Sequence, residues 1–338
     1  MSPPSLATAV WFPRAREVEL RQEPLPPVGP GEVRVRAIAS AISHGTEMLV
    51  YRGQVPPDLP LDLPALRGSF SFPIKYGYAS AGRIEEVGSA LTELRVGDLV
   101  FAHHPHQNRY VVPAATVVQL PEGLNPEAGV FLANLETAVN VVLDAGIRLG
   151  ERVAIFGQGV VGLLLTQLAR RVGADLVVAV DPLPRRRELA LAVGADVALP
   201  PGDGLPDRIR ALCDGVGVDV AIEASGHGAA LGQAIDSVAF QGTVVVSSWY
   251  GTKPVNLMLG GCFHRGRVRM VSSQVSNLDP ALQPRWSRDR RMGVALGLLG
   301  ELRLEPLITG RVPLERAAEA YRQIDLHPED TVQLLLTY

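Results

Sequence analysis

The chain carries two successive patterns of apolar and polar positions. Up to about residue 125, short apolar stretches are interrupted by glycine and proline, and residues 32–38 alternate polar and apolar side chains as a half-buried strand does. Further short strands are predicted at residues 83–87, 98–102 and 109–112. This part of the chain is therefore predicted to be rich in β-structure.

The pattern changes at Pro126, which opens a helical segment expected to run to about Asp144, with proline in a favoured first-turn position. Apolar strands then alternate with helices that begin at about Val160 and Arg185. Because such strands are typical of parallel sheets covered on both faces, the fold class is predicted to be α/β with a doubly wound sheet. Its strands are expected at residues 152–156, 176–181, 195–199, 218–224, 242–248 and 268–272.

Composition narrows the class of protein. With 338 residues, of which 47% are hydrophobic, the chain is long enough for about two domains of ~100–200 residues each and is not a disordered protein. The net charge of −3 gives no reason to expect binding to nucleic acid or to an anionic membrane. The longest apolar stretches, such as residues 160–165, are far shorter than the ~18–20 residues of a membrane span. The chain also begins without the basic and apolar regions of a signal peptide, so a cytoplasmic protein is expected.

Cysteine usage limits the chemistry. Cys213 and Cys262 are the only cysteines of the sequence. Two cysteines exclude a disulfide scaffold, a four-cysteine structural zinc lobe and an iron–sulfur cluster. This cysteine usage agrees with the expected cytoplasmic location.

The strongest functional signal is a glycine-rich loop between a predicted strand and a predicted helix. Gly157, Gly159 and Gly162 follow the apolar strand at 152–156 with the spacing of a dinucleotide-binding fingerprint. Gly157 is expected to allow the tight turn, Gly159 the approach of the backbone to a pyrophosphate, and Gly162 the close packing of helix on strand. The helix N-terminus would offer free N–H groups to the phosphates. The residues expected to bind the cofactor here are Gly157, Gln158, Gly159, Val160, Val161 and Gly162.

An acidic residue at the end of the next strand indicates which dinucleotide binds. Asp181 lies 24 positions after Gly157, close to the ~20 expected of the acid that accepts hydrogen bonds from the ribose 2′-hydroxyl. Its charge favours NAD over NADP. The run of arginines at 185–187 leaves NADP open, because Arg186 could hold a 2′-phosphate, although a solvated helix face explains the same run.

These motifs together resemble the medium-chain dehydrogenase/reductase superfamily over essentially the whole chain. Besides the glycine loop, the likeness is carried by the segments at 30–33, 82–88, 96–100 and 304–315. The resemblance implies a GroES-like catalytic domain, split in sequence around a Rossmann domain, with the active site in the cleft between them. The expected boundaries are residues 1–134 for the first part of the catalytic domain, 135–275 for the Rossmann domain and 276–338 for the returning catalytic tail, which should contain a helix, a loop, a helix and a strand at 332–336.

Two local features refine the resemblance. The loop is of the type found in polyol and alcohol dehydrogenases rather than in quinone reductases. The segment at 42–47, followed by Tyr51-Arg-Gly and Pro56, is similar to a subgroup that includes the hydroxyethyl bacteriochlorophyllide dehydrogenases. Neither feature identifies the substrate.

The chain departs from the zinc-dependent members of the superfamily. By resemblance, Ser43 stands at a cysteine position and Gly77-Tyr78-Ala79 at a Gly-His-Glu motif, and these side chains cannot replace thiolate, imidazole and carboxylate as zinc ligands. Glu136 falls where sorbitol-dehydrogenase-like members keep an acid beside the metal, but one ligand is too few. A metal-free enzyme is expected. The histidines of residues 103–106 are a weaker metal candidate, and a place on the rim of the cleft or at the surface is expected for them.

Without zinc, hydrogen-bond donors must stabilise the developing alkoxide. By resemblance Tyr78 replaces a metal ligand, and it is the leading candidate for the proton donor; it could also simply fill the metal cavity. An unshifted tyrosine, with a pKa near ~10, donates a proton well but abstracts one poorly, which favours carbonyl reduction unless a neighbour such as Lys75 lowers that pKa. His44 could pass a proton through Ser43 or Thr46 to solvent, or be an ordinary loop histidine.

Other side chains are expected to support this site or the cofactor. Glu47 and Glu136 could orient the catalytic groups, and each is also credible as a buried hydrogen-bond partner. The segments at 223–226 and 247–251 end strands at the carboxyl edge of the sheet, where ligands bind in open α/β folds. The cofactor contacts expected there are Ala224, Ser225, Ser247 and Trp249. Arginines of residues 285–291 could clamp an acidic group, or belong to a surface helix capped by Ser287.

The sequence thus predicts a metal-free, NAD(H)-dependent oxidoreductase that interconverts a secondary alcohol and a carbonyl of a small-molecule substrate. One alternative is an NADPH-dependent, zinc-free reductase of an activated double bond. Another is a dinucleotide-binding sensor or partner protein with little catalysis. A homodimer or homotetramer is implied by the resemblance, with the strand at 267–273 as the candidate edge for pairing.

Overall fold

The computed structural model of the protein describes residues 6–61 and 68–338, and its chain forms two compact units. One unit comprises the described residues up to Ala133 together with 308–338, and the other comprises Asn134–Leu307. Residues 276–307, which the sequence assigns to the returning tail, therefore belong to the second unit. No helix in the described part of the chain is long and apolar enough to cross a membrane.

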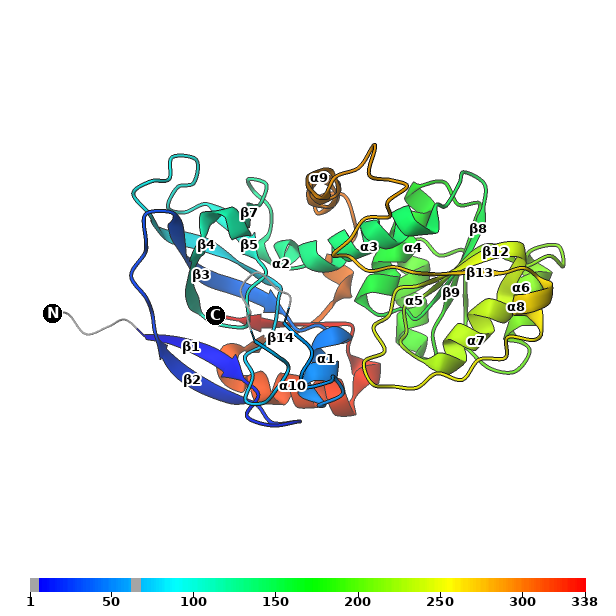
Figure 1. Cartoon of the computed structure of the whole chain (residues 1–338), viewed down its shortest axis with the longest axis horizontal. Helices are drawn as coiled ribbons and strands as arrows, with labels where there is room; N and C mark the ends of the chain where they lie inside the picture. The colour runs from blue at the N-terminus through cyan, green and yellow to red at the C-terminus, as the bar shows by residue number, and fades with distance from the viewer. Residues whose placement is uncertain (1–5, 62–67) are drawn as a thin grey trace. The chain divides into compact units, whose positions relative to one another are not determined.

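The first unit is built on β-structure, as its sequence pattern predicts. A mixed sheet has the strand order β14-β15-β3-β4-β5-β7, with β6 also paired to β3, and a separate hairpin joins β1 to β2 (Figure 1). In β3, buried and less buried positions alternate over most of its length, which is the burial that its polar and apolar alternation predicts. The strands are β1 Leu6–Trp11, β2 Glu19–Pro24, β3 Glu32–Ala41, β4 Ser80–Val87, β5 Leu99–Ala102, β6 Arg109–Pro113, β7 Val117–Gln119, β14 Ile308–Pro313 and β15 Gln333–Thr337.

The first unit also contains helices. They are α1 Thr46–Tyr51, α2 Pro126–Gly129 and α10 Ala317–Leu326, with short 3-10 turns at Ala114–Thr116, Leu314–Arg316 and Pro328–Asp330. The single helix predicted from Pro126 is interrupted after Gly129, where the next helix, α3 Leu132–Ala145, begins separately. Gly129 lies so close to the side chain of Leu120 that an added Cβ would approach it to 2.5 Å, so packing on the sheet ends this first helix. Strand β14 is missing from the sequence prediction because its residues are all partly exposed.

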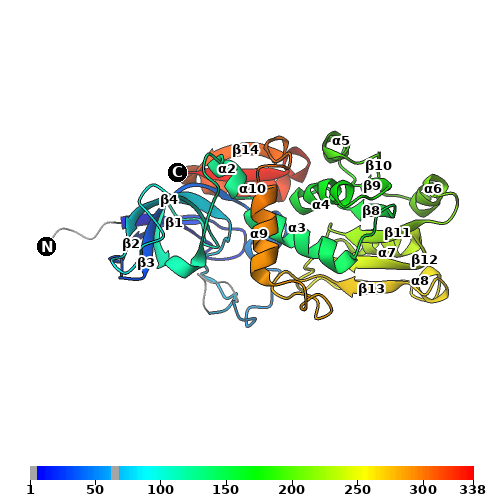
Figure 2. The ribbon, with the colours of Figure 1, turned by 90° about the horizontal axis from the view of Figure 1, so that it is seen from above.

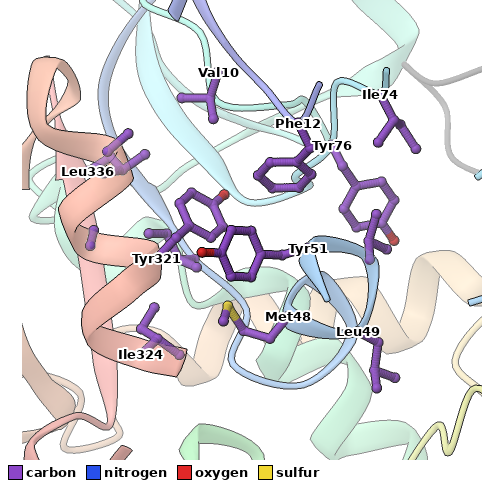
Figure 3. Packing of buried hydrophobic residues seen from close by; sticks show 14 of the residues in the cluster. Val10, Phe12, Met48, Leu49, Tyr51, Ile74, Tyr76, Tyr321, Ile324 and Leu336 are labelled. Carbon is purple, nitrogen blue, oxygen red and sulfur yellow. The ribbon is translucent and has the colours of Figure 1, made fainter. Parts of the chain in front are cut away.

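An aromatic cluster forms a core of the first unit. Phe12, Tyr51 and Tyr321 pack with ring centroids 5.1 to 5.7 Å apart, and Figure 3 shows them arriving from three different segments of the chain. Tyr321 belongs to α10 and Tyr51 to α1, so this cluster ties the returning tail to the helix that follows β3. Buried aromatic pairs of this kind stabilise beyond their area alone, by about 0.5–1.5 kcal/mol each.

The second unit is the doubly wound parallel sheet that the sequence predicts. Its strand order is β10-β9-β8-β11-β12-β13, and every neighbouring pair is parallel (Figure 2). The chain leaves β10 at one edge and returns to β11 beside β8, which makes the junction of β8 and β11 the topological switch point where such folds bind ligands. The strands are β8 Arg152–Phe156, β9 Leu176–Val180, β10 Val197–Leu199, β11 Val218–Glu223, β12 Val238–Val246 and β13 Arg269–Ser272.

Helices cover this sheet. Helices α4 and α5 pack on β8, β9 and β10, and α7 packs on β11 and β12. Ser287 caps α9 as predicted, since its side chain accepts a hydrogen bond from the N–H of Arg290. The helices are α3 Leu132–Ala145, α4 Val160–Arg171, α5 Pro184–Val193, α6 Leu205–Leu212, α7 Gly228–Ser237, α8 Cys262–Arg265 and α9 Arg288–Leu298, with a 3-10 turn at Glu305–Leu307.

Candidate active site

The loop between β8 and α4 has the geometry that its glycines predict. Gly157 has a φ of +97°, and a Cβ there would lie 2.7 Å from the amide nitrogen of Ser225. A Cβ on Gly162 would lie 1.9 Å from the carbonyl oxygen of Gly157, so α4 can approach the strand end only with glycine at this position. Around Gly159, by contrast, the space for a Cβ is open to 4 Å.

This loop fits the phosphates of a dinucleotide. Gly159 is the N-cap of α4 and supplies no side-chain capping bond, so the first N–H groups of this twelve-residue helix are not capped by a side chain of that residue. Such amides, with the positive end of the helix dipole, bind anionic groups. The loop is thus able to hold a pyrophosphate through its backbone alone.

Two side chains of the loop serve packing. Gln158 is fully buried, where its amide donates to the carbonyl of Ile155 and accepts from the hydroxyl of Thr166. Val160 is also buried and belongs to the core face of α4. The predicted cofactor contacts of Gln158 and Val160 are therefore possible only through their backbone, whereas the side chain of Val161 is partly exposed.

Asp181 follows β9, and its carboxylate is held in place by backbone groups. One oxygen accepts from the N–H of Gln158 at 2.7 Å and the other from the N–H of Leu183 at 2.9 Å. The residue is 2% exposed. These bonds join the predicted ribose-binding acid directly to the glycine-rich loop. The two parts of the fingerprint are therefore in contact.

The arginines that follow Asp181 do not all lie on a solvent-exposed helix face. Arg186 is half-buried with its guanidinium 3.9 Å from the Asp181 carboxylate, and burial lowers the pKa of Arg186 while Asp181 raises it. Arg187 donates to the carbonyls of Asp181 and Pro182 at 2.8 Å. Of the three arginines only Arg185 is exposed, so Arg186 and Arg187 do not fit the solvated interpretation.

The loop after β11 lies against the glycine-rich loop. The N–H of Ala224 donates to the carbonyl of Phe156, and Glu223, which is fully buried, accepts from the hydroxyl and N–H of Ser225. The hydroxyl of Ser247 donates to the carbonyl of Glu223 at 2.8 Å. The hydroxyls of Ser225 and Ser247 thus have partners within the protein. The indole of Trp249 is 38% exposed, so it is accessible to a ligand.

In the first unit, Tyr78 lies beside the hydroxyls of the turn before α1. The side-chain hydroxyls of Ser43 and Thr46 interact with the hydroxyl of Tyr78. Burial raises the pKa of Tyr78 to about 12, the negative charge of Glu47 acts in the same direction, and the two hydroxyls oppose it. Lys75 does not lower this pKa, because its ammonium is bonded to Glu23 at 2.7 Å and to Gln107 at 3.0 Å. Tyr78 therefore stays protonated across the physiological range.

His44 belongs to the same turn and is half-buried between Ser43 and Gly45. The turn ends at Gly45, the N-cap of α1, and Thr46 and Glu47 open that helix. The structure thus brings together every catalytic candidate of the first unit.

Glu47 is the centre of a buried polar network that the sequence does not reveal. Its carboxylate accepts from His106 at 2.8 Å, from the hydroxyl of Tyr321, and from the N–H of Ser43 at 3.1 Å. Glu47 and His106 are both fully buried. Tyr321 lies 274 positions from Glu47, and its place in an amphipathic helix predicts only a core residue.

The histidine segment is interior rather than on a rim or at the surface. His104 is buried and its ring stacks on Tyr110 with centroids 3.8 Å apart, and burial lowers the pKa of His104 to about 3. His106 is bonded to Glu47, and His103 meets the carbonyl of Tyr78 at 3.2 Å. The expectation of exposure was wrong for His104 and His106, because both rings pack in the core of the GroES-like unit.

Glu136 is paired with an arginine and not with the catalytic groups that it was expected to orient. In the second unit, its carboxylate accepts two hydrogen bonds from Arg291, at 2.6 and 3.2 Å, and Arg291 also donates to Asn140 at 2.5 Å. Arg291 is 2% exposed and Glu136 9%. Arg291 is therefore not available to clamp an anionic substrate. Nothing in the local sequence around either residue reveals this pair, which joins positions 155 apart.

The residues at the expected zinc positions have other partners in the described part of the chain. The hydroxyls of Ser43 and Tyr78 interact with each other, Ala79 has no side-chain ligand atom, and the Glu136 carboxylate is bonded to a guanidinium. Within residues 6–61 and 68–338, the one cluster of three side chains with metal-ligand spacing is His327, Glu329 and Asp330, all exposed and remote in sequence from these positions.

Comparison with known proteins identifies the class. Residues 29–122 match the family described as alcohol dehydrogenase GroES-like domain, and residues 160–288 match the family described as zinc-binding dehydrogenase. D-guloside 3-dehydrogenase of Escherichia coli K12 is 31% identical over 327 residues, covering 91% of this chain and 93% of that protein.

Solved structures share the fold over the whole chain. An alcohol dehydrogenase of Escherichia coli CFT073 complexed with NADH gives a TM-score of 0.81 at 20% identity and covers 99% of this chain and all of that one. A dehydrogenase of Sinorhizobium meliloti 1021 bound to NADP gives a TM-score of 0.78 at 23% identity with the same coverage.

The chain belongs to the medium-chain dehydrogenase/reductase superfamily. It is an NAD(P)-dependent oxidoreductase of that class, as the sequence predicts.

Proposed function

We propose that the protein interconverts a secondary alcohol and the corresponding carbonyl compound with NAD(H), using Tyr78 in place of zinc. One observation carries the proposal. The Tyr78 hydroxyl interacts with the hydroxyls of Ser43 and Thr46, and its pKa is raised to about 12, so at neutral pH it is protonated and able to donate.

The chemistry follows from that protonation state. A bound nicotinamide dinucleotide supplies or accepts the hydride. In the direction of reduction, the Tyr78 hydroxyl donates a hydrogen bond to the carbonyl oxygen and its proton to the developing alkoxide. The phenolate left behind keeps its hydrogen bonds from Ser43 and Thr46. Solvent then returns one proton, for which His44 in the same turn is the proposed route.

A zinc-independent mechanism is supported by the side chains themselves. Of the residues at the positions that the resemblance assigns to the metal site, only Glu136 has a good metal-binding group, and its carboxylate is already paired with the charge of Arg291. A structural or catalytic zinc site takes three or four ligands from the protein. Ser43, Tyr78 and Ala79 supply none that bind zinc well.

NAD is proposed as the physiological cofactor. The buried Asp181 carboxylate has free lone pairs for a ribose 2′-hydroxyl and its charge repels a 2′-phosphate. The half-buried Arg186, 3.9 Å from that carboxylate, is the one observation that favours NADP, and with it the alternative of a double-bond reductase. Because Asp181 is the more deeply buried and is fixed by two backbone bonds, NAD is preferred.

The proposed substrate is a sugar-like molecule with a ring secondary hydroxyl. The relative that is 31% identical over nearly the whole chain is named for oxidation at position 3 of a D-guloside. A protonated, uncharged donor at Tyr78 suits a neutral polyol rather than an acid.

A homodimer is proposed from the edge of the Rossmann sheet. Strand β13 ends the sheet, and all its residues are at least partly exposed, including Met270 at 43%. Met258 is 88% exposed on the segment before β13. An open apolar edge of this kind is stabilised by pairing with a second copy. Light scattering should give twice the chain mass, and Met270→Asp should give the monomer.

Reaction type is tested by product analysis. Metal-free protein with NADH is assayed against a panel of oxidised glycosides, simple ketones and enones. Reduction of the carbonyl group to a secondary alcohol supports the proposal. Saturation of the carbon–carbon double bond, or a preference for NADPH in that reaction, contradicts it in favour of the alternative.

A further inference from the structure

His106 is fully buried, and both of its ring nitrogens are used. Nε2 lies 2.8 Å from Glu47, and Nδ1 lies 2.6 Å from the hydroxyl of Ser40, which lies 2.6 Å from the hydroxyl of Tyr338. Since a carboxylate only accepts, Nε2 must carry the hydrogen of this contact. In the neutral ring, Nδ1 then accepts from Ser40, and Ser40 accepts from Tyr338. In this series of hydrogen bonds, each donor therefore points towards Glu47.

Glu47 in turn fixes the turn that carries the partners of Tyr78. Its second oxygen accepts from the N–H of Ser43 at 3.1 Å. Helix α1 has only six residues, and its N-cap, Gly45, makes no side-chain capping bond. A helix of this length is not stable by propensity. The position of the Ser43 and Thr46 hydroxyls therefore depends on tertiary bonds, among which those of Glu47 are prominent.

His106 also packs against the segment that carries Tyr78. Gly77 has a φ of +134°, and a Cβ there would lie 2.8 Å from Cδ2 and 2.9 Å from Nε2 of His106. The same imidazole thus contacts the backbone next to Tyr78 and, through Glu47, holds the turn to which the Tyr78 hydroxyl is bonded. No other side chain described above touches both segments in this way.

Tyr321 gives Glu47 a second anchor from the returning tail. Its ring packs on Phe12 and Tyr51, with centroids 5.1 and 5.3 Å away (Figure 3). Its hydroxyl donates to the same carboxylate oxygen as His106. Loss of His106 would thus leave Glu47 anchored on one side only. The expected defect is a misplaced turn rather than an unfolded unit.

We propose that His106 is a positioning residue for the reaction, which acts through Glu47 to hold the Ser43 and Thr46 hydroxyls against Tyr78. The inference rests on the proposed role of Tyr78 as proton donor. The function that we assign to the histidine segment at residues 103–106 is therefore positioning by His106 and not metal binding.

A matched pair of variants tests it. In His106→Gln the amide nitrogen reaches the place of Nε2 and can donate to Glu47, whereas in His106→Asn it reaches only the place of Nδ1. We expect kcat for carbonyl reduction to fall by less than about 3-fold in the Gln variant and by about 10- to 100-fold in the Asn variant. The dissociation constant for NADH, measured by fluorescence, should stay unchanged in both, since the glycine-rich loop belongs to the other compact unit. Circular dichroism and melting temperature confirm that both variants are folded.

Each variant is then combined with Tyr78→Phe. If His106 acts through the bonds to the Tyr78 hydroxyl, His106→Asn should cause no further loss of kcat in the Phe background, because that hydroxyl is absent. Equal effects of Gln and Asn, or an undiminished loss in the Phe background, would overturn the inference and leave the role of Tyr78 intact. Unchanged turnover of Tyr78→Phe alone would instead overturn the proposed function, and this inference with it.

Discussion

The carboxylate of Glu136 is bonded twice to the guanidinium of Arg291, and both side chains are buried in the Rossmann unit. The pair joins α3 to α9, and Asn140 accepts a third bond from the same guanidinium. The resemblance places an acid beside a metal at position 136. In this structure the carboxylate of Glu136 is instead paired with the cationic side chain of Arg291. This relationship explains why residues 288–298 belong to the Rossmann unit.

Removing one member of this pair should be more harmful than removing both. Arg291→Met leaves the Glu136 carboxylate buried without its cation, so the free energy of unfolding should fall by about 3–5 kcal/mol. Arg291→Met combined with Glu136→Leu should recover most of that loss. Urea unfolding of the two proteins makes the comparison, and equal losses would show that Glu136 does not need Arg291.

The glycines of the β8–α4 loop should respond differently to the same change. Gly162→Ala places a methyl group 1.9 Å from the backbone oxygen of Gly157, so it should destabilise the unit and weaken NADH binding. Gly159→Ala has no such clash in the protein, so it should leave stability unchanged and weaken only cofactor binding. Thermal melting with and without NADH separates the two effects. A Gly159→Ala variant with full NADH affinity would contradict the assignment of this loop to the pyrophosphate.

Cofactor preference should depend on Asp181. Asp181→Asn removes the charge that repels a 2′-phosphate and keeps one acceptor oxygen, which can meet the N–H of either Gln158 or Leu183 but not both. With Arg186 close by, NADPH affinity should rise about tenfold or more relative to NADH. Fluorescence titration with both cofactors measures the ratio. Tighter binding of NADPH by the unaltered protein would show that Arg186, not Asp181, decides the preference.

Acid stability should depend on His104. Burial lowers the pKa of His104 to about 3, from an ordinary value near ~6.5. Below about pH 6.5 the unfolded chain therefore binds a proton that the folded protein does not, and stability falls by about 1.4 kcal/mol per pH unit until about pH 3. His104→Phe keeps the stacking on Tyr110 and should flatten this slope, whereas His327→Gln, at an exposed histidine, should not. Urea unfolding between pH 4 and pH 7 makes the comparison.

The sequence predicts the parts of the fold and of the site that depend on neighbouring residues. Strand β8 has the bounds predicted for it, and Gly157, Gly162 and Asp181 have the geometry that the fingerprint implies, because turn, strand and helix cap are encoded locally. The long-range polar pairs are not encoded in this way. Glu47 with Tyr321 and Glu136 with Arg291 join residues 274 and 155 positions apart, and no local pattern signals either pair.

The same distinction explains the histidine segment. An extended segment with three histidines has the local appearance of a metal or surface site, yet the rings of His104 and His106 are buried by contacts with distant parts of the chain. His104 stacks on Tyr110 and His106 is bonded to Glu47 and Ser40. The role of each histidine therefore depends on its burial and on its contact partners and not on its residue type alone.

The role of Tyr78 as the proton donor is tested most directly with the variant Tyr78→Phe, in protein shown by elemental analysis to contain no zinc. The substitution removes one hydroxyl and keeps the ring, so folding and NADH affinity should be unchanged. With Tyr78 as the proton donor, kcat for carbonyl reduction should fall by about 10²- to 10⁴-fold, while the wild-type protein should be active without metal and insensitive to a chelator. Full activity of the Phe variant, or wild-type activity that appears only when zinc is added, would contradict the metal-free role of Tyr78.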